Sequence, residues 1–420
     1  MSSARHAAVS ALMAYHSGKS SAETALDKQI SGQKLDGRDT ALATKLTFGV
    51  LQNRALLDFY LGQFLSTPVE KLQPRVLDIL RVAAYQIVFL DRVPPRAAVD
   101  EAVQMTKTSS PKAAGLVNAV LRRLTEAVGA TVPGRPPPPE PPSLAIKYSH
   151  PEWMVQRFID LLGEDEAEAL LAANNAEVPI YAQINTLKAD AIQLDGAEPH
   201  PWLPNCLVLQ GVGNPAHLQP FQDGLLYIQD PAAKRAILAA DPQPGTSVLD
   251  ACAAPGGKSF AAAIQMGNKG EILASDLQEK KLAKIEEGAN RLGIDIIKTR
   301  AMDARTIGLA DPLVDTVIVD APCSGLGIIR KKPEIRYKTP EEIARLPEIQ
   351  LEILTGAARA VAPGGTLLYA TCTILPEENS GVVEAFLSET TDFSIEEQRT
   401  LYPHTDGTDG FFYCKLRRRK

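Results

Sequence analysis

The sequence predicts a multidomain protein of α and α/β class, in which an all-helical domain precedes an open α/β domain. Three observations support this prediction. Apolar residues recur at helical spacing before residue 133, a proline-rich stretch interrupts the chain, and short apolar strands alternate with helical segments from residue 246 onward. A chain of 420 residues has room for two to three domains of about 150 residues. We expect a helical domain at 1–132, a linker at 133–142, a small α+β region at 143–228 and the α/β domain at 229–420.

The helical domain is predicted from apolar faces. In residues 75–90, Val76, Leu77, Leu80 and Ala83 fall on one face of a helix, and the prolines that follow end the pattern. Similar faces run through residues 7–15, 41–64 and 97–124. The linker follows because proline lacks a backbone donor and fixes φ, so residues 133–142 can neither continue a helix nor join the centre of a sheet.

The second half of the chain alternates between two patterns. Residues 151–174 read as helical, and the stretch to about residue 230 mixes short strands with turns. Further on, the pattern predicts an open parallel sheet with helices on both faces. The expected strands are 246–251, 271–275, 316–320 and 366–370, and the expected helices are 261–264, 279–292 and 340–361.

The composition is that of a globular protein without a membrane segment. The hydrophobic fraction is 45%, no run of about 18 apolar residues is present, and the first 20 residues lack a secretory pattern. We therefore expect a cytoplasmic protein. The five cysteines are widely spread and include no Cys-x-x-Cys pair, which argues against a disulfide framework or a zinc knuckle.

The charge is unevenly distributed along the chain. The net charge is −6, but residues 1–142 carry 17 lysines and arginines against 12 acidic residues, while the remainder is acidic overall. Basic patches are the usual sign of nucleic-acid binding. An overall negative charge therefore does not exclude a nucleic-acid partner for this chain.

The first chemical motif is Asp-Ala-Cys-Ala-Ala-Pro-Gly-Gly-Lys-Ser at residues 250–259, between a predicted strand and a predicted helix. Small residues let a ligand approach the backbone, and the amides at a helix N-terminus favour negative charge. A P-loop would need glycine at position 252, where this chain has Cys252, and the dinucleotide fingerprint G-x-G-x-x-G is absent. The motif predicts a nucleotide-like ligand, with a plain strand-to-helix connection as the alternative.

Acidic residues follow two of the expected strands. Asp276 stands where a doubly wound sheet places a carboxylate against ribose hydroxyls, and Asp303 could accept a bond from an adenine amine. Aspartates also cap helices at such junctions, so each residue alone is weak evidence.

Two cysteines also follow expected strands. Asp320-Ala-Pro-Cys323 ends one strand, and Thr371-Cys372 directly follows another. A single cysteine is more often a small buried residue than a nucleophile. Two cysteines at the ligand-binding edge of an α/β sheet instead favour activated thiolate chemistry.

These motifs, with Leu-Pro-Glu-Glu-Asn at residues 375–379, resemble the RNA cytosine-C5 methyltransferases that use S-adenosylmethionine. Residues 51–54 and 114–122 resemble the NusB-type RNA-binding module. The tandem is similar to the bacterial 16S ribosomal RNA small-subunit methyltransferase B (Sun/Fmu) family. The resemblance implies a NusB-like domain followed by a Rossmann-like, S-adenosylmethionine-dependent methyltransferase domain.

The family pattern also implies roles for individual residues. Cys372 would add to carbon 6 of cytosine, Cys323 would assist breakdown of the adduct, Asp320 would hydrogen-bond the base, and Lys258 would position the reacting groups. In DNA cytosine-C5 enzymes the Pro-Cys residue itself attacks, so Thr371-Cys372 favours the RNA class. S-adenosyl-L-methionine would be held by Asp276, Asp303, Asp320 and the loop of Cys252, Ala253, Ala254, Pro255, Gly256, Gly257 and Lys258.

The expected partner is 16S ribosomal RNA, with no membrane, no metal and a monomeric chain. A basic strip offers phosphate contacts, with an exposed charged loop as the alternative. The strip comprises Arg330, Lys331, Lys332, Arg336 and Lys338. Methylation of another RNA and a non-catalytic NusB-like RNA-binding factor stay open as alternative functions. Intact cysteines, loop lysine and carboxylates favour an enzyme.

Overall fold

The computed structural model describes residues 4–18, 20–128, 140–307 and 312–420. Its contacts divide the chain into two compact units, Met1–Asn175 and Ala176–Lys420, here named the helical unit and the sheet unit. Most of the predicted linker at 133–142 lies outside the described residues. The predicted domain boundaries stay predictions. The first part of the predicted α+β region at 143–228, up to residue 175, belongs by its contacts to the helical unit.

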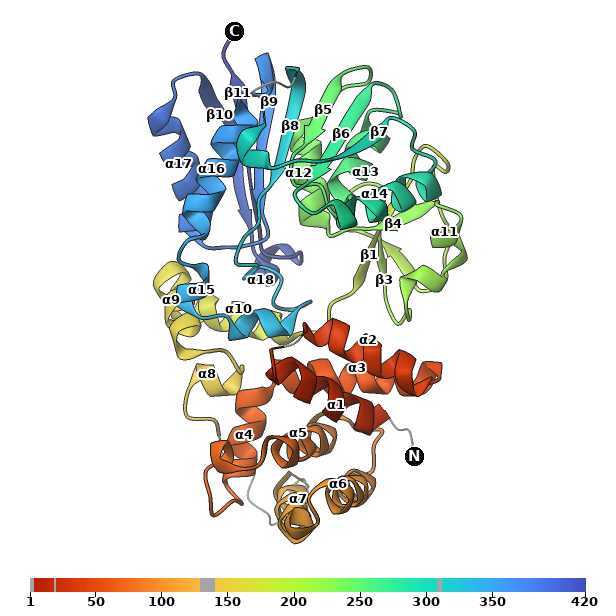
Figure 1. The fold of residues 1–420 in the computed structure, drawn as a ribbon, viewed down its shortest axis with the longest axis vertical. Coiled ribbons are helices and arrows are strands. Elements are labelled where there is room, and N and C mark those ends of the chain that lie inside the picture. The colour runs from red at the N-terminus through yellow and green to blue at the C-terminus, as the bar shows by residue number, and fades with distance from the viewer. Residues whose placement is uncertain (1–3, 19, 129–139, 308–311) are drawn as a thin grey trace. The chain divides into compact units, whose positions relative to one another are not determined.

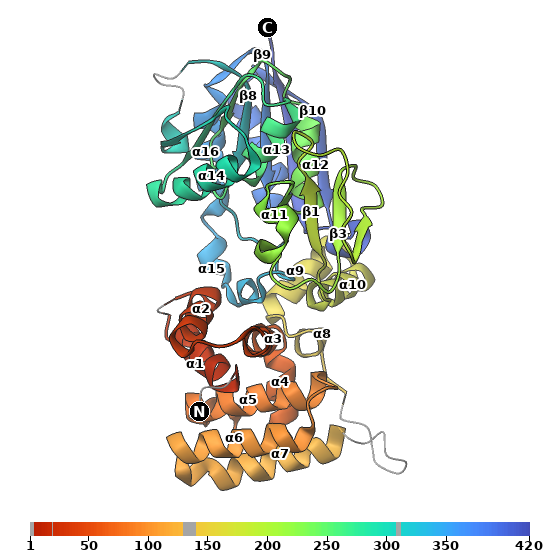
Figure 2. The same ribbon diagram turned by 90° about the vertical axis from the view of Figure 1, so that its right-hand side faces the viewer.

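The helical unit confirms the predicted all-helical class (Figures 1 and 2). The single helix expected at 41–64 is two helices, because the chain turns at Asn53. The helix Ala22–Gln33 was not predicted, since it buries only Ala22, Ala25 and Leu26. The helices are α1 (Ala4–His16), α2 (Ala22–Gln33), α3 (Gly37–Gln52), α4 (Arg54–Gly62), α5 (Pro74–Phe89), α6 (Pro95–Ser109), α7 (Ala114–Val128), α8 (Leu144–Lys147), α9 (Glu152–Leu162) and α10 (Glu164–Asn175).

The sheet unit begins with a small antiparallel sheet, which confirms the predicted α+β region. Its strand order is β2-β3-β1-β4, and the short helix α11 (Gln219–Gln222) precedes the last strand. The strands are β1 (Ile180–Ile184), β2 (Ala197–Pro199), β3 (Cys206–Leu209) and β4 (Leu226–Ile228).

Within the described residues, the large sheet has seven strands in the order β10-β11-β9-β8-β5-β6-β7 (Figure 1). Five neighbouring strands are parallel, as expected. The prediction of a wholly parallel sheet is wrong at one edge, where β11 runs antiparallel to both of its neighbours. The short connection at 402–410 reverses the chain between β10 and β11, and such a connection cannot join parallel strands. The strands are β5 (Ser247–Asp250), β6 (Glu271–Asp276), β7 (Ile297–Ala301), β8 (Val314–Asp320), β9 (Val361–Thr371), β10 (Phe393–Leu401) and β11 (Phe411–Arg418).

Helices cover both faces of the large sheet, as predicted. Alternate residues of the central strands enter opposite cores: Ile318 packs with α12, α13 and α14, whereas Val317 and Val319 pack with α16 and α17. The helix expected at 340–361 is divided into α15 and α16. The helices are α12 (Pro231–Ala240), α13 (Gly257–Gln265), α14 (Glu279–Leu292), α15 (Pro340–Ile343), α16 (Leu346–Ala358), α17 (Ser380–Glu389) and α18 (Pro403–Asp406).

The carboxyl ends of the five parallel strands meet at one edge of the sheet. In the register of β8 with β9, Asp320 pairs with Ala370, so the segments that follow these two strands start side by side. In the same way, Asp276 at the end of β6 pairs with Ala301 at the end of β7. Parallel pairing therefore gathers the chemical motifs at this edge.

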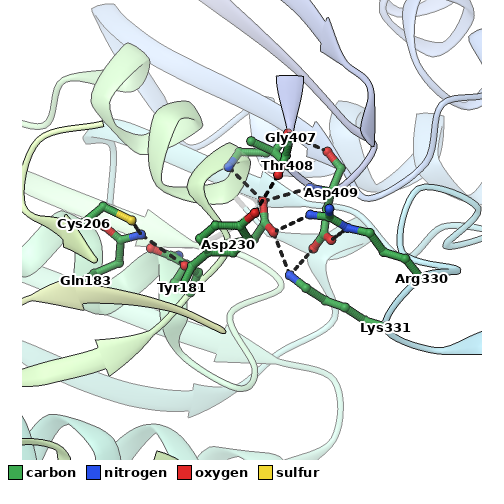
Figure 3. Close-up of polar contacts among 11 residues, drawn as sticks. Tyr181, Gln183, Cys206, Asp230, Arg330, Lys331, Gly407, Thr408 and Asp409 are labelled. Carbon is green, nitrogen blue, oxygen red and sulfur yellow. Dashed lines mark hydrogen bonds and ion pairs between the residues drawn. The ribbon is translucent and has the colours of Figure 1, made fainter. Parts of the chain in front are cut away.

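A cluster of four charges, buried except for the Lys331 side chain, which is 33% exposed, joins the small sheet to the large one (Figure 3). Asp230 follows β4 and caps α12, Asp409 precedes β11, and Arg330 and Lys331 lie in the loop after β8. The Lys331 Nζ lies 2.6 Å from Asp230 and 2.7 Å from Asp409, and the Arg330 Nε lies 3.0 Å from Asp409. Buried charges are tolerated when each has an opposite partner, which is the case here.

Loss of one charge from this cluster should destabilise the sheet unit. Asp230→Asn keeps the shape and the helix cap but leaves two cations with one carboxylate, so we expect the free energy of unfolding to fall by about 3 kcal/mol. Urea unfolding followed by Trp202 fluorescence in a Trp153→Phe background measures the change.

The matched control is Asp392→Asn, whose side chain is 62% exposed and 3.9 Å from Arg418. It should change the free energy by less than about 0.5 kcal/mol. If the two substitutions lowered the free energy of unfolding equally, the charge cluster would stabilise the sheet unit no more than an exposed ion pair does.

Candidate active site

A cavity of about 700 Å³ opens at the carboxyl edge of the large sheet. It brings together side chains from the ends of all five parallel strands. The predicted residues that line it are Cys252, Ala254, Asp276, Asp303, Asp320, Cys323, Lys332, Lys338 and Cys372. Residues up to 120 positions apart therefore share one space that could hold both a ligand and a reacting base.

The two cysteines lie in contact within this cavity. The Sγ atoms of Cys323 and Cys372 are 3.3 Å apart, and both thiols are free. Cys323 follows the end of β8 by three residues and Cys372 follows the end of β9 directly, so the pairing of these strands brings the sulfurs together.

The surroundings of Cys323 disfavour its thiolate. The hydrogen bond to Cys372, burial, and the charges of Cys372 and Glu378 together raise the pKa of the Cys323 thiol well above its usual value. Cys323 is therefore a thiol at neutral pH, and it can serve as a proton donor or hydrogen-bond donor beside Cys372.

Lys258, which is buried, and Asp320, whose side chain is 31% exposed, form an ion pair beside the cysteines. Lys258 lies in the first turn of α13, and its Nζ is 2.5 Å from Asp320 Oδ2. Burial disfavours the ammonium, but the charge of Asp320 and its hydrogen bond outweigh burial and raise the pKa of Lys258. The negative charge of a Cys372 thiolate acts in the same direction, so Lys258 remains a cation that stabilises negative charge nearby.

The loop before α13 needs glycine at one position. Gly256 has a φ of +111°, and a Cβ there would lie 2.5 Å from the ring of Phe260. Both constraints exclude larger residues. In the same segment, Ser259 donates to the fully buried Asp250 at 2.7 Å, and burial raises the pKa of Asp250 to about 7.

Only part of the predicted cofactor loop faces the cavity. Cys252 and Ala254 line it, whereas Ala253 is buried and its N–H donates to Ser275 at 2.7 Å. Pro255 and Gly257 line a separate hollow of about 460 Å³. The loop consists of turns, and α13 begins at Gly257, so its residues face different spaces.

Asp276 and Asp303 have both of the roles that the sequence left open, capping a local turn and facing the ligand site. Asp276 accepts from the N–H of Gln278 at 2.9 Å, and Asp303 accepts from the N–H of Arg305 at 3.0 Å, so both cap local turns. Both also line the cavity. Side-chain hydrogen bonds from Arg305 lower the pKa of Asp303, which therefore is a carboxylate at neutral pH.

The predicted basic strip is not one exposed surface. Arg330 and Lys331 are held by the carboxylates of the buried cluster, and Arg336 is fully buried, with its Nε donating to Pro333 O at 3.1 Å. Burial lowers the pKa of Arg336 to about 10. This leaves Lys332 and Lys338 at the cavity as members of the strip that a ligand could reach.

Sequence reasoning missed the buried polar side chains behind the cysteines. Glu378, Asn379 and Gln350 are each at most 2% exposed, and they bond to the segments that carry Cys323 and Cys372. Residues 375–379 contributed to the family resemblance, but nothing in their pattern indicated which partners they would have.

Two further properties of the described residues bear on function. In the ranges that the structure describes, no helix is long and apolar enough to cross a membrane. Within those same ranges, no group of three or more histidine, cysteine or acidic side chains is placed to hold a metal ion.

Comparison with known proteins agrees with this architecture. The family model described as 16S rRNA methyltransferase RsmB/F matches residues 237–417, the NusB family model matches 2–126, and the RsmF/B-like ferredoxin-like domain model matches 150–214. The probable ribosomal RNA small subunit methyltransferase B of Bacillus subtilis is 37% identical, with 99% of each chain covered. The chain belongs to the ribosomal RNA small subunit methyltransferase B family. This membership confirms the resemblance found in the sequence.

Other members and solved structures extend the comparison. The probable ribosomal RNA small subunit methyltransferase B of Synechocystis is 32% identical over the full length of both chains. The crystal structure of PH0851 is 27% identical, with a TM-score of 0.80 over 99% of this chain and 98% of that chain. A methyltransferase homolog protein from Pyrococcus horikoshii is 26% identical, with a TM-score of 0.58 over 66% of this chain and all of that chain. The predicted Rossmann-like methyltransferase fold is confirmed.

The contact between the sulfurs predicts how Cys323 reacts with alkylating agents. Since Cys372 raises the pKa of the Cys323 thiol, wild-type Cys323 should react slowly with iodoacetamide at pH 7.5 and faster as the pH rises. Cys372→Ala removes that cause, lowers the pKa and should speed the reaction at pH 7.5. Peptide mass mapping follows Cys323 separately from the other cysteines.

The control is Cys414→Ala, which removes a buried cysteine on β11 and should leave the rate at Cys323 unchanged. An unchanged or slower reaction of Cys323 in Cys372→Ala would contradict the assigned cause.

Proposed function

We propose that the chain methylates carbon 5 of a cytosine in 16S ribosomal RNA, with S-adenosyl-L-methionine as methyl donor and a covalent bond between Cys372 and carbon 6 of the base. One observation carries the proposal: two cysteine sulfurs lie 3.3 Å apart in a cavity that is also lined by Asp320, the ion-pair partner of Lys258, and by two further aspartates. Membership of a ribosomal RNA methyltransferase family supports the RNA substrate.

The chemistry of cytosine explains the need for a nucleophile. Carbon 5 is a poor nucleophile until a thiolate adds to carbon 6 and moves electron density onto carbon 5. In this proposal Cys372 makes the addition, and Lys258 stabilises the thiolate before it attacks. Asp320 hydrogen-bonds the edge of the base and favours its activated form.

The second sulfur suits the second half of the reaction. After carbon 5 has taken the methyl group, its proton must leave and the bond between carbon 6 and Cys372 must break. Cys323 lies against the Cys372 sulfur, and its raised pKa keeps it protonated while Cys372 attacks. This division supports Cys372 as the nucleophile and Cys323 as the group that assists release.

The cavity suits S-adenosylmethionine, which supplies an activated methyl group when bound. Cys252 and Ala254 offer a closely approachable loop, the Asp276 carboxylate can accept from ribose hydroxyls, and Asp303 can accept from the adenine amine. About 700 Å³ is within the usual range for a small-molecule site, with space left for a base.

The RNA must present an unstacked cytosine to this cavity, from a loop or by extrusion. Lys332 and Lys338 line the cavity and provide cations for the neighbouring phosphates. We further propose that the chain acts as a cytoplasmic monomer and binds no metal.

The direct test is methyl transfer in vitro. Incubation with labelled S-adenosylmethionine and unmethylated 16S ribosomal RNA should place the label on carbon 5 of cytosine. Bisulfite mapping of ribosomal RNA from a deletion strain should then name the position. Absence of transfer while the cofactor still binds would contradict the proposed function and favour a non-catalytic RNA-binding factor.

The two cysteines should fail at different steps. Cys372→Ala removes the nucleophile, so neither transfer nor adduct is expected. Cys323→Ala should still form the covalent bond but release it slowly, so a protein–RNA adduct should survive denaturing electrophoresis. Wild-type turnover by Cys372→Ala would exclude the assigned nucleophile.

Cofactor affinity should depend on Asp276. Hydrogen bonds to a charged group contribute about 1.5–3 kcal/mol, so Asp276→Ala should weaken S-adenosylmethionine binding about 10- to 100-fold in calorimetric titration. Asp295→Ala changes an exposed aspartate and should bind normally. Equal affinities of the two variants would place the ribose elsewhere.

A further inference from the structure

Two consecutive buried residues, Glu378 and Asn379, hold the two cysteine segments: the shorter contacts of Glu378 are to the segment of Cys323 and its longer one is to Thr373, whereas Asn379 contacts the segment of Cys372. Both follow β9 and lie at the turn that precedes α17. Glu378 is 1% exposed and Asn379 is 2% exposed. Side chains this deeply buried cannot bind RNA themselves, so any part they take in the reaction must act through the residues that they hold.

Glu378 holds the segment that carries Cys323. Its Oε2 accepts from the N–H of Ser324 at 2.8 Å and from the Nε2 of Gln350 at 2.9 Å. The same Gln350 amide donates to Pro322 O at 2.9 Å. The residues on both sides of Cys323 are therefore fixed to one carboxylate and one amide.

Asn379 holds the segment that carries Cys372. Its Oδ1 accepts from the hydroxyl of Thr371 at 2.6 Å, and its Nδ2 donates to Thr373 O at 3.0 Å. These two partners flank Cys372 directly. A single amide therefore fixes the backbone and side chain on either side of the second cysteine.

Glu378 and Asn379 both bind Thr373, the first through its hydroxyl and the second through its carbonyl. Thr373 Oγ1 donates to Glu378 Oε1 at 3.3 Å and lies 2.8 Å from the hydroxyl of Ser324. All of these side chains are buried, so each lost bond would leave a polar group without a partner and shift the segment that it holds. The network therefore holds the residues on both sides of each sulfur.

We propose that Glu378 and Asn379 are positioning residues for different steps of the methyl transfer: Asn379 for formation of the adduct through Cys372, and Glu378 for its release through Cys323. The inference rests on the proposed function. In release, a water molecule takes the proton from carbon 5, the electron pair of that bond forms the double bond between carbons 5 and 6, and the carbon–sulfur bond breaks with its electrons going to Cys372, whose sulfur accepts the proton of the neighbouring Cys323 thiol. Displacement of Cys323 slows this step without affecting the attack.

Single-turnover reactions of the full chain with S-adenosylmethionine and 16S ribosomal RNA separate the two steps. Denaturation-resistant adduct measures formation, and free methylated RNA measures release. Glu378→Ala should form the adduct at nearly the wild-type rate and release it about 100-fold more slowly, since a displacement of about 1 Å can cost that factor. Asn379→Ala should slow formation by a similar factor and accumulate no adduct.

Two variants keep the test independent of folding. In Glu378→Gln the amide oxygen can still accept from Ser324 and Gln350 while the amide N–H faces Thr373, so release should be largely restored. Gln350→Ala retains Glu378 but loses the bond to Pro322, and it should accumulate adduct like Glu378→Ala. Glu384→Ala makes the same change as Glu378→Ala at an exposed position of α17 and should match the wild type.

Two results would overturn the inference: equal slowing of both steps in the Glu378 and Asn379 variants, or no adduct in Glu378→Ala and Gln350→Ala. If the wild type still methylated the RNA in these experiments, the proposed function would stand. Failure of the wild type to methylate the RNA would contradict the proposed function itself, and the assignment of the two steps would fall with it.

Discussion

The pairing of β8 with β9 is the constraint on which the site depends. Asp320 is in register with Ala370, so the segments that follow the two parallel strands begin side by side, and the two cysteines that they carry come into contact at 3.3 Å. A shift of register by one residue would move one segment along the other by about 3.3 Å and separate the two sulfurs. The cavity, the Lys258–Asp320 ion pair and the contacts of Glu378 and Asn379 with the cysteine segments all require this alignment.

Paired charges serve two separate purposes in the sheet unit. At the cavity, Lys258 and Asp320 neutralise each other and keep a cation beside the reactive sulfur. In the cluster of Figure 3, Arg330 and Lys331 join two carboxylates from distant segments and hold the small sheet against the large one. Because breaking such pairs is costly, the chain after β8 is held at Asp320, where β8 ends, and again at Arg330 and Lys331.

Much of the fold and of the cavity could be predicted from the sequence, because strand-to-helix alternation and residues at strand ends are local patterns. The antiparallel edge of β10 and β11 could not, since it depends on a short reversal rather than on apolar spacing. The basic strip shows the same limit: adjacent cations look alike in sequence, but Arg336 is buried while Lys338 reaches the cavity. The partners of Glu378 come from segments 28 and 54 residues away, which no local pattern reveals.

The central claim is that Cys372 forms a bond with carbon 6 of the target cytosine. The most direct measurement uses RNA that carries 5-fluorocytosine at the target. Hydrogen leaves carbon 5 as a proton, but fluorine cannot leave as a cation, so the methylated adduct is trapped. Digestion and mass spectrometry should find the nucleotide on the peptide that contains Cys372. A nucleotide attached to the Cys323 peptide, or no attached nucleotide despite methyl transfer to unmodified RNA, would contradict the account.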